Sequence, residues 1–434
     1  MDREKFLLRP LEHLYELSRP PLNMPMLAGD WQCMNVVVND HRVQTRPGYV
    51  SFRSLGDNVK IQYIAPYIRG DETKNVLFLS ETDLCKVETA SGKTFSYKTE
   101  TQTYLTTKQV DSIDAATKLI VTFEGAATLV TDGISAGDKF ILDEDQSSDV
   151  EPDADWREIA SVDSETQLTL TAAYKKAVTS PGNKDAKIRK VYSMPTRERW
   201  QYAAVDDKFC FTNGNVDVQY WGGTNYASAL NSTSAKKARY CLSYAQRLLI
   251  ADVEISSTRE PWTVMWSKSG DPTDWTDSSA GSIDFLKTES KITGLGQVGN
   301  NVVVYKKDSF IIGYRTGDST DPFTFPNERI GIGSVAPYGL ISFLGTNGFV
   351  SKENIYILNG DQPEPIGDPI KYKFYSIIDK DELQHVWGVH LAPINHIIWF
   401  ANTNEGHLAF AYDYQDKQWS TFQYYNHITG AGEA

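Results

Sequence analysis

The sequence is poor in cysteine, has no surplus of basic residues and lacks long apolar runs, and each absence excludes a class of protein. Its four cysteines show no CxxC spacing, so we expect buried small hydrophobic side chains instead of disulfides or a zinc site. A net charge of −13 favours solubility and opposes binding to free nucleic acid. No apolar run approaches the roughly 20 residues of a membrane span, and the charged N-terminus lacks the apolar core of a signal peptide. The cysteines are Cys33, Cys85, Cys210 and Cys241.

Recognisable catalytic and cofactor motifs are also missing. The chain contains no GxSxG, HExxH, P-loop or GxGxxG sequence. The short runs Gly294-Leu295-Gly296 and Gly331-Ile332-Gly333 open no helix and are typical of bends or bulges in strands. We therefore predict no catalytic, cofactor-binding or metal-binding residue, no cofactor, and a protein that is not an enzyme.

Three clusters have both a functional and a structural interpretation, and the structural one is favoured each time. The acidic run Asp143–Asp155 could bind calcium but lacks the EF-hand spacing, so a solvated acidic loop is expected. His385, His390 and His396 match no common metal pattern, which favours half-buried imidazoles bonded to backbone. Lys236-Lys237-Ala238-Arg239 is a compact basic cluster without interleaved aromatics, so a solvated loop is favoured over a nucleic-acid contact.

One further turn bears on catalysis, because some propeller proteins are glycosidases with paired carboxylates near the central channel. Ser267-Lys268-Ser269-Gly270-Asp271, followed by Trp275, is faintly similar to the sialidase Asp-box. The order of Gly and Asp differs from that motif, and the pattern occurs once. A simple turn is the favoured interpretation.

What the chain has in quantity is short strand-like runs. Aromatic residues make up 12% of it, including 23 Tyr and 10 Trp, which favours strands. The segment 262–317 contains four such runs separated by turn residues, with no helical period. This is the size of one or two propeller blades, and a blade needs neighbours to bury both of its faces.

The same pattern recurs along most of the chain, so the predicted fold class is all-β. We expect a degenerate β-propeller of about six or seven blades, at about 45–50 residues each, with a small inserted β-barrel or sandwich and an N-terminal arm. The expected parts are an extended arm at 1–30, a first part of the propeller at 31–103, the inserted β-domain at 104–192 and the remainder of the propeller at 193–434. Residues 31–45 should close the ring by adding a strand to the C-terminal blade.

The N-terminal arm is rich in apolar side chains, and Pro20-Pro21 forces extended chain after it. An arm of this kind is expected to dock, either on its own domain or on a neighbouring copy. Its candidate inter-subunit contacts are Phe6, Leu7, Leu11 and Leu14.

The order of several short motifs resembles that of a known family. An Asn-bearing hydrophobic strand precedes Arg-x-Gly, a Trp-x₈-Trp turn follows in the middle of the chain, and Gly-rich strand starts come after it. Together they resemble the tail hub or nozzle proteins of tailed phages, the packaged-DNA stabilisation family. The motifs are Asn35–Val38 with Arg46–Tyr49, Trp266–Trp275, Ile292–Gly296 with Val302–Lys306, Gly331–Pro337, Gly345–Ser351 and Ile355-Tyr356.

The resemblance implies a structural virion component of the tail, made in the host cytoplasm. Copies of the propeller would form a homo-oligomeric ring, expected to be six-fold, below the portal and adaptor. The ring would continue the channel for double-stranded DNA without reading its sequence, retain the packaged genome, support its ejection and carry a plug, needle or fibres. An acidic lumen would not grip phosphates.

Two alternatives remain open from the sequence. A propeller that binds a glycan or receptor would show exposed aromatic side chains clustered at a blade mouth. A glycosidase would show two facing carboxylates and turnover of a glycan.

Overall fold

The computed structural model describes most of the chain after residue 60, together with two short strands before it. The described residues are 36–39, 42–45, 61–90, 94–99, 104–125, 127–131, 134–142, 145, 156–182, 184–189, 191–195, 197–223, 227–230 and 234–423. The arm residues Phe6, Leu7, Leu11 and Leu14 lie outside this set.

The chain divides into two compact units. The propeller unit contains β1 and β2, β13 and β14, and every element from β17 to β33. The barrel unit contains β3 to β12 together with β15 and β16.

Five small antiparallel sheets follow one another from β13 to the C-terminal strand, and each is a meander of consecutive strands. The first sheet contains β13 (Gln201–Val205), β14 (Lys208–Thr212), β15 (Gln219–Trp221) and β16 (Ser228–Ala229). The second contains β17 (Ala235–Tyr244), β18 (Arg247–Ile255), β19 (Thr258–Trp266) and β20 (Gly281–Asp284). The third contains β21 (Ile292–Val298), β22 (Asn301–Lys306), β23 (Ser309–Arg315), β24 (Phe323–Thr324) and β25 (Glu328–Ile330).

The last two sheets continue the pattern. The fourth contains β26 (Ile341–Phe343), β27 (Thr346–Val350), β28 (Ile355–Asn359) and β29 (Gln362–Pro365). The fifth contains β30 (Trp387–Leu391), β31 (His396–Thr403), β32 (Gly406–Asp413) and β33 (Gln418–Gln423).

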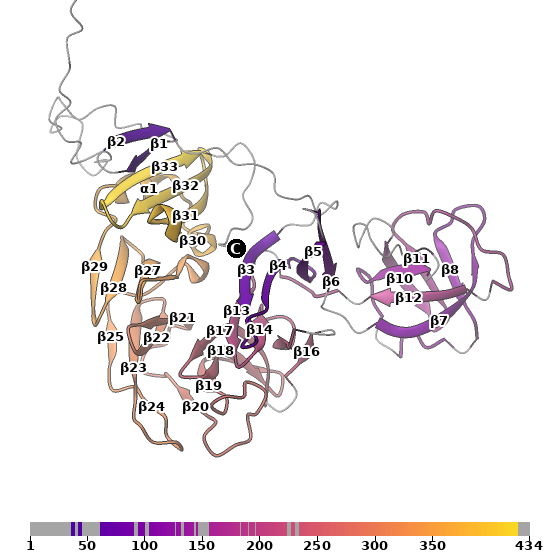
Figure 1. The fold of residues 1–434 in the computed structure, drawn as a ribbon, viewed down its shortest axis with the longest axis horizontal. Helices are drawn as coiled ribbons and strands as arrows, with labels where there is room; N and C mark the ends of the chain where they lie inside the picture. The colour runs from indigo at the N-terminus through magenta and orange to yellow at the C-terminus, as the bar shows by residue number, and fades with distance from the viewer. Residues whose placement is uncertain are drawn as a thin grey trace, which may run out of the picture. The chain divides into compact units, whose positions relative to one another are not determined.

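The first strands of successive sheets lie side by side, which gives the propeller-like arrangement visible in Figure 1. Contacts join β13 to β17, β17 to β21, β21 to β26, and β26 to β30. The predicted all-β propeller class is therefore confirmed, but the arrangement has five sheets where six or seven were expected. The excess came from counting residues 31–103 as propeller, whereas their one four-stranded sheet belongs to the barrel unit.

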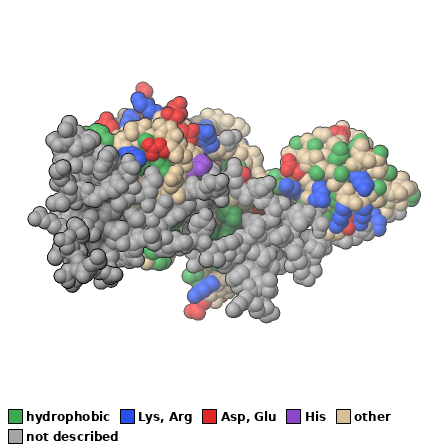
Figure 2. All heavy atoms as spheres, turned by 90° about the horizontal axis from the view of Figure 1, so that it is seen from above, with side chains coloured by type: hydrophobic (Ala, Val, Ile, Leu, Met, Phe, Trp, Pro, Cys, Tyr) green, Lys and Arg blue, Asp and Glu red, His purple; other side chains and the backbone are tan. Residues whose placement is uncertain are grey.

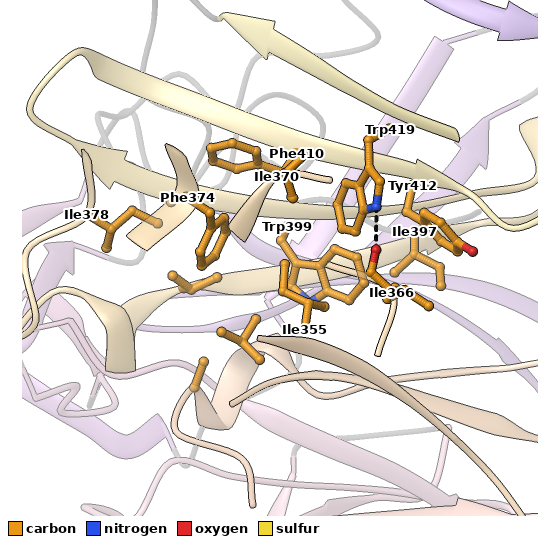
Figure 3. Close-up of a cluster of buried hydrophobic side chains, with 14 of the residues drawn as sticks. Ile355, Ile366, Ile370, Phe374, Ile378, Ile397, Trp399, Phe410, Tyr412 and Trp419 are labelled. Atoms are coloured by element: carbon orange, nitrogen blue, oxygen red, sulfur yellow. Dashed lines mark hydrogen bonds between the residues drawn. The ribbon is translucent and has the colours of Figure 1, made fainter. Parts of the chain in front are cut away.

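A large apolar core joins the fourth and fifth sheets, as Figure 3 shows. Trp399 and Trp419 pack with ring centroids 5.7 Å apart, and Trp399 has no exposed surface. The Trp419 indole Nε1–H donates to the Ile366 carbonyl at 2.8 Å, and the Trp399 Nε1–H donates to the Gly339 carbonyl at 2.9 Å. Each buried indole thus has a partner, so the core gains apolar burial without leaving these donors unsatisfied.

The same core is covered by the short helix α1 (Lys371–Ile377), which the strand pattern did not predict. Its buried residues Phe374 and Ile377 are three apart and therefore lie on one helix face. Phe374 meets Phe410 edge-on, with centroids 4.9 Å apart. A seven-residue helix is stabilised by this packing more than by its own propensity, which explains why periodicity alone missed it.

Within the barrel unit, β3 to β12 form one four-stranded sheet and one closed barrel. The sheet contains β3 (Ile61–Ile68), β4 (Lys74–Ser80), β5 (Leu84–Ala90) and β6 (Thr94–Thr99). The barrel contains β7 (Tyr104–Ile113), β8 (Ile120–Phe123), β9 (Lys139–Leu142), β10 (Arg157–Ser164), β11 (Gln167–Leu170) and β12 (Lys184–Arg189). The strand order is β10-β11-β8-β7-β12-β9, and pairing of β9 with β10 closes it.

The barrel has a hydrophobic core of its own, to which every strand contributes. Closure leaves no unpaired edge strand, and an interior of this size is filled by side chains. The small inserted β-barrel expected from the sequence is therefore present as a closed barrel. The fully buried side chains, one from each strand, are Val110, Val121, Phe140, Ile159, Leu168 and Ala186.

The described strands near the N-terminus form a hairpin of β1 (Val36–Asn39) and β2 (Arg42–Thr45). The hairpin is a two-stranded sheet by itself, and β1 lies next to β33 in the propeller unit. The predicted closing segment therefore adjoins the C-terminal sheet, but the strand order of that sheet ends at β33.

The described surface in Figure 2 carries acidic and basic side chains interspersed with each other. Among the residues described, no helix combines the length and apolar character needed to cross a membrane.

Candidate functional site

The basic cluster noted in the sequence belongs to a strand and not to a solvated loop. Lys236–Arg239 lies within β17, where Lys237 pairs with Glu254 at 3.1 Å. Arg239 forms a half-buried ion pair with Glu198. The loop prediction was wrong because two apolar neighbours, Ala235 and Ala238, are fully buried and anchor the strand.

The three histidines do not converge on a metal. The His390 Nε2 lies 3.3 Å from the Tyr414 hydroxyl, and the His396 Nδ1 contacts the Ile394 carbonyl, the type of backbone partner that was predicted. No group of three His, Cys, Asp or Glu side chains in the described ranges is arranged to hold a metal ion.

The acidic run is described at one position, Asp145, in the barrel unit. Its carboxylate accepts from Lys176 at 2.9 Å and from the Tyr174 hydroxyl at 2.8 Å. Burial opposes ionisation of this carboxyl, but the two hydrogen bonds outweigh it, and the pKa of Asp145 is lowered. The negative charge of Asp145 is thus paired with neighbouring side chains of the same unit.

The Trp266–Trp275 segment is a turn, as favoured from the sequence. Asp271 accepts from the Thr273 amide at 3.0 Å, and Asp274 accepts from the Thr276 amide at 3.1 Å, so each caps its own bend. The Trp275 indole donates to the Pro272 carbonyl at 2.8 Å. These carboxylates serve the turn instead of facing each other across a channel.

Two of the four cysteines lie in the part with described side chains. Cys210 and Cys241 are free and buried, as expected for small hydrophobic side chains. Burial raises the pKa of the Cys210 thiol to about 12, which keeps it protonated and unreactive.

A group of seven polar side chains, not singled out by the sequence, gathers where four sheets of the propeller unit meet. We refer to it as the charged cluster. It contains two carboxylates, three basic side chains and two tyrosines. Its members are Glu198, Arg239, Tyr240, Asp252, Arg259, Lys291 and Tyr338.

Glu198, which precedes β13, joins three sheets. One carboxylate oxygen accepts from Arg239 in β17, and the other accepts from the hydroxyl of Tyr338, which precedes β26. Tyr338 is buried, and burial together with the charge of Glu198 holds its pKa well above the ordinary value. The tyrosine therefore stays protonated and acts as a donor to Glu198.

A second ion pair lies beside the first. Asp252 has a φ of 55° and lies at a register shift between β18 and β19, and Arg259 of β19 donates to it through two nitrogens, with Nε at 2.6 Å. The Asp252 side chain is fully buried, whereas the Arg259 side chain is 49% exposed. The hydrogen bonds that Arg259 donates to Asp252 raise the pKa of Arg259, against the opposing effect of burial.

Two members of the cluster have no hydrogen-bond or ion-pair partner among the described residues. Tyr240 is 2% exposed, and its hydroxyl is buried without a partner. Lys291, just before β21, is exposed. Partial burial of its ammonium, with repulsion from Arg239 and Arg259, lowers the pKa of Lys291. The cluster thus has two satisfied ion pairs, one surplus cation and one free hydroxyl.

Sequence reasoning missed this cluster because its members are spread over 141 positions, from 198 to 338. A weak signal existed: Glu198, Lys291 and Tyr338 each lie within three residues of the first strand of a sheet. In a propeller such positions meet at one end of the neighbouring first strands.

Comparison with known proteins gives no family. No family model and no curated protein matches the chain. Solved structures that match weakly include a phage phi92 endosialidase, at 10% identity and TM-score 0.21, covering 70% of this chain and 45% of that one. The nidogen/laminin complex matches at 9% identity and TM-score 0.32, covering 68% and 98%. Hsv2 of Kluyvelomyces marxianus matches at 8% and 0.31, covering 84% and 98%. At these scores no function transfers to this chain.

Proposed function

We propose that the chain is a structural component of a phage tail, a hub or nozzle whose copies form a ring around the DNA channel. Its role is mechanical: it retains packaged DNA, supports ejection and contacts an adaptor and a needle, plug or fibres. The proposal rests on the order of the motifs in the sequence and on a propeller whose sheets are pinned to one another.

Hydrogen bonds between neighbouring sheets are the observation that carries the proposal. The Tyr244 hydroxyl of the second sheet donates to the Asn300 carbonyl of the third at 2.6 Å. The Gly299 amide of the third sheet donates to the Gly345 carbonyl of the fourth at 2.8 Å. The Trp419 indole ties the fifth sheet to the segment that follows the fourth. Hydrogen bonds at three of the four junctions between these sheets suit a rigid wedge that transmits load between ring neighbours.

Exposed apolar side chains of the propeller unit are candidates for contact between copies. Single exposed side chains are common on monomers, but several on one unit add a site for association. Those with high exposure are Leu286 at 66%, Ile330 at 65%, Leu344 at 73% and Tyr372 at 61%.

The mass of the purified chain tests this proposal. The full chain should assemble into one closed species of several copies by native mass spectrometry, expected to be six. A variant lacking residues 1–30 should lose that species if Phe6, Leu7, Leu11 and Leu14 hold the neighbour. A monomeric full chain at micromolar concentration would contradict the ring, and intact rings from the truncated chain would contradict the role of the arm.

The alternative of glycan or receptor binding is less supported. Its expected sign was a group of exposed aromatic side chains at one mouth of the propeller. Among the described residues, Tyr372 is the one large aromatic side chain with high exposure. Binding of the chain to a panel of glycans would revive this alternative.

A further inference from the structure

Three Asn-Gly pairs occur in the chain, at positions 213–214, 347–348 and 359–360. Asparagine is a thermolabile residue, because the backbone nitrogen that follows it can attack the carbon of its side-chain amide. A following glycine favours this attack, since it has no Cβ to obstruct the approach. The attack also requires a side chain that can turn and a backbone amide that is not held in a ladder, and the three pairs differ in both respects.

Two of the pairs are held in place by their surroundings. Asn213 is 1% exposed, and its Oδ1 accepts from the amides of Asn215 and Val216 at 2.9 and 3.0 Å. Asn347 has no exposed surface, and Gly348 is paired on both sides within the fourth sheet. A fixed, buried side chain or a backbone amide committed to a ladder prevents the attack.

The third pair lies in an exposed hairpin turn of the fourth sheet. The β28–β29 ladder ends where Asn359 pairs with Gln362, so the Gly360 amide lies in the turn beyond it. Gly360 has a φ of 69°, as primed hairpin turns require, and a Cβ placed on it would meet no atom within 4 Å. Asn359 and Gly360 are both exposed. The side-chain amide therefore has room to turn onto the following nitrogen.

The neighbouring residue Asp361 anchors this turn to the third sheet. Arg329 of β25 donates through Nη2 to the Asp361 carboxylate at 2.8 Å and through Nη1 to the Asp361 carbonyl. Both of these bonds go to Asp361, and neither involves the Asn359 side chain or the Gly360 amide. A change at Asn359 thus occurs two positions from an ion pair that joins two sheets.

We propose that Asn359 is a site of spontaneous deamidation in the folded protein. The Gly360 nitrogen gives up its proton to solvent and bonds to the Asn359 Cγ, the bond from Cγ to the amide nitrogen breaks, and ammonia leaves. Water then opens the cyclic imide at one of its two carbonyls, which gives aspartate or isoaspartate. The net reaction consumes one water, releases ammonia and adds one negative charge to a chain whose net charge is −13. The site is independent of the tail function proposed above.

Peptide mapping of the purified full chain, before and after incubation at mildly alkaline pH, tests the proposal. Asn359 should convert to a mixture of aspartate and isoaspartate, and an isoaspartyl methyltransferase should label the second product. Asn213 and Asn347 should stay intact. Asn404 is the matched control for exposure without glycine, because it lies in an exposed hairpin turn and precedes Glu405. It should convert at least about tenfold more slowly than Asn359.

Unfolding the chain separates the effect of structure from that of sequence. In concentrated urea the fold no longer protects Asn213 and Asn347, so all three Asn-Gly pairs should react. In Asn359→Gln, the acidic form that accumulates in the native parent should be absent on isoelectric focusing. An intact Asn359 in the native chain, conversion of Asn213 or Asn347 in the native chain as fast as that of Asn359, or equal rates at Asn404 and Asn359 would each overturn the proposal.

Discussion

Lys306 and Glu328 form the most deeply buried ion pair among the described residues, with side chains 0% and 4% exposed and 3.4 Å between charged atoms. The Lys306 ammonium also donates to the carbonyls of Phe285 and Thr288, both at 2.9 Å. Burial nevertheless lowers the pKa of Lys306, and the attraction of Glu328 offsets only part of that effect. Such a pair stabilises mainly by being complete, since either charge alone would be buried without compensation.

Removing one partner of this ion pair should therefore lower the free energy of unfolding more than removing both partners. We expect Lys306→Met to lower the free energy of unfolding by about 3–5 kcal/mol, because it strands a buried carboxylate. The double variant Lys306→Met with Glu328→Leu should recover part of that loss. Urea unfolding of the two proteins checks this, and a double variant as unstable as the two losses combined would contradict it.

Glu328 also predicts a pH dependence. Burial works to raise the pKa of its carboxyl, but hydrogen bonds from Ser309 at 2.6 Å and Thr288 at 2.5 Å, with Lys306, outweigh it and hold the pKa below the ordinary 4.5. A carboxyl with a lowered folded pKa contributes stability above its unfolded pKa and loses it as pH falls through the folded value. Stability should thus decline below pH 4.5, and less steeply in Glu328→Gln.

The urea midpoint measured between neutral pH and pH 3 follows this loss. Glu353→Gln, at an exposed position, provides the control, and its urea midpoint should change with pH as steeply as that of the parent protein. Equal slopes for Glu328→Gln and the parent would show that Glu328 does not contribute.

At the scale of single elements, the turn after β22 depends on a glycine close to the backbone. A Cβ at Gly333 would lie 2.3 Å from the Lys306 carbonyl oxygen and 2.5 Å from the Ser309 nitrogen, too close for either to remain in place. Gly333→Ala should therefore destabilise the chain by about 1–3 kcal/mol. Gly125→Ala, which meets no atom within 4 Å, is the control for a glycine replaced in open space. Thermal unfolding of both variants checks the difference, and equal stability would contradict the close approach.

The positions of many strands were predictable from the sequence, because short strands joined by tight turns produce local patterns of apolar residues and turn residues. Residues 208–212, an aromatic-rich run before an Asn-Gly turn, form β14, and Asn213 caps that turn by accepting from the Asn215 amide at 2.9 Å. The bulge expected at Gly294 is present as a register shift in β21. In contrast, β7 and β12 were missed, since their ladder joins positions about 80 residues apart.

The candidate site was not predictable in the same way. The charged cluster depends on the register shift between β18 and β19 at Asp252, and on four sheets that bring positions 198 and 338 into contact. Neither a register shift nor the meeting of separate sheets leaves a local sequence pattern. The blade count of six or seven was too high for a related reason, because the strands of 61–99 have the same local pattern as propeller strands but lie in the barrel unit.

For the whole molecule, the barrel is expected to be separable from the propeller. Tyr104 and Arg189 are register partners in the β7–β12 ladder, so the chain enters and leaves the barrel at neighbouring positions about 5 Å apart. Replacing residues 104–192 with a short Gly/Ser linker should leave the propeller folded, since each unit has its own core. Near-ultraviolet circular dichroism, to which the buried tryptophans Trp387, Trp399 and Trp419 of the fifth sheet contribute, measures this. Loss of that signal would contradict separate folding.

Ring formation by a mechanically stiff propeller is the central claim, and images of the purified full-length chain by electron microscopy test it most directly. The account predicts closed annular particles of uniform size with an open centre, expected to show six-fold symmetry, in which each wedge is one propeller. A homogeneous field of isolated single-chain particles at the same concentration would contradict it.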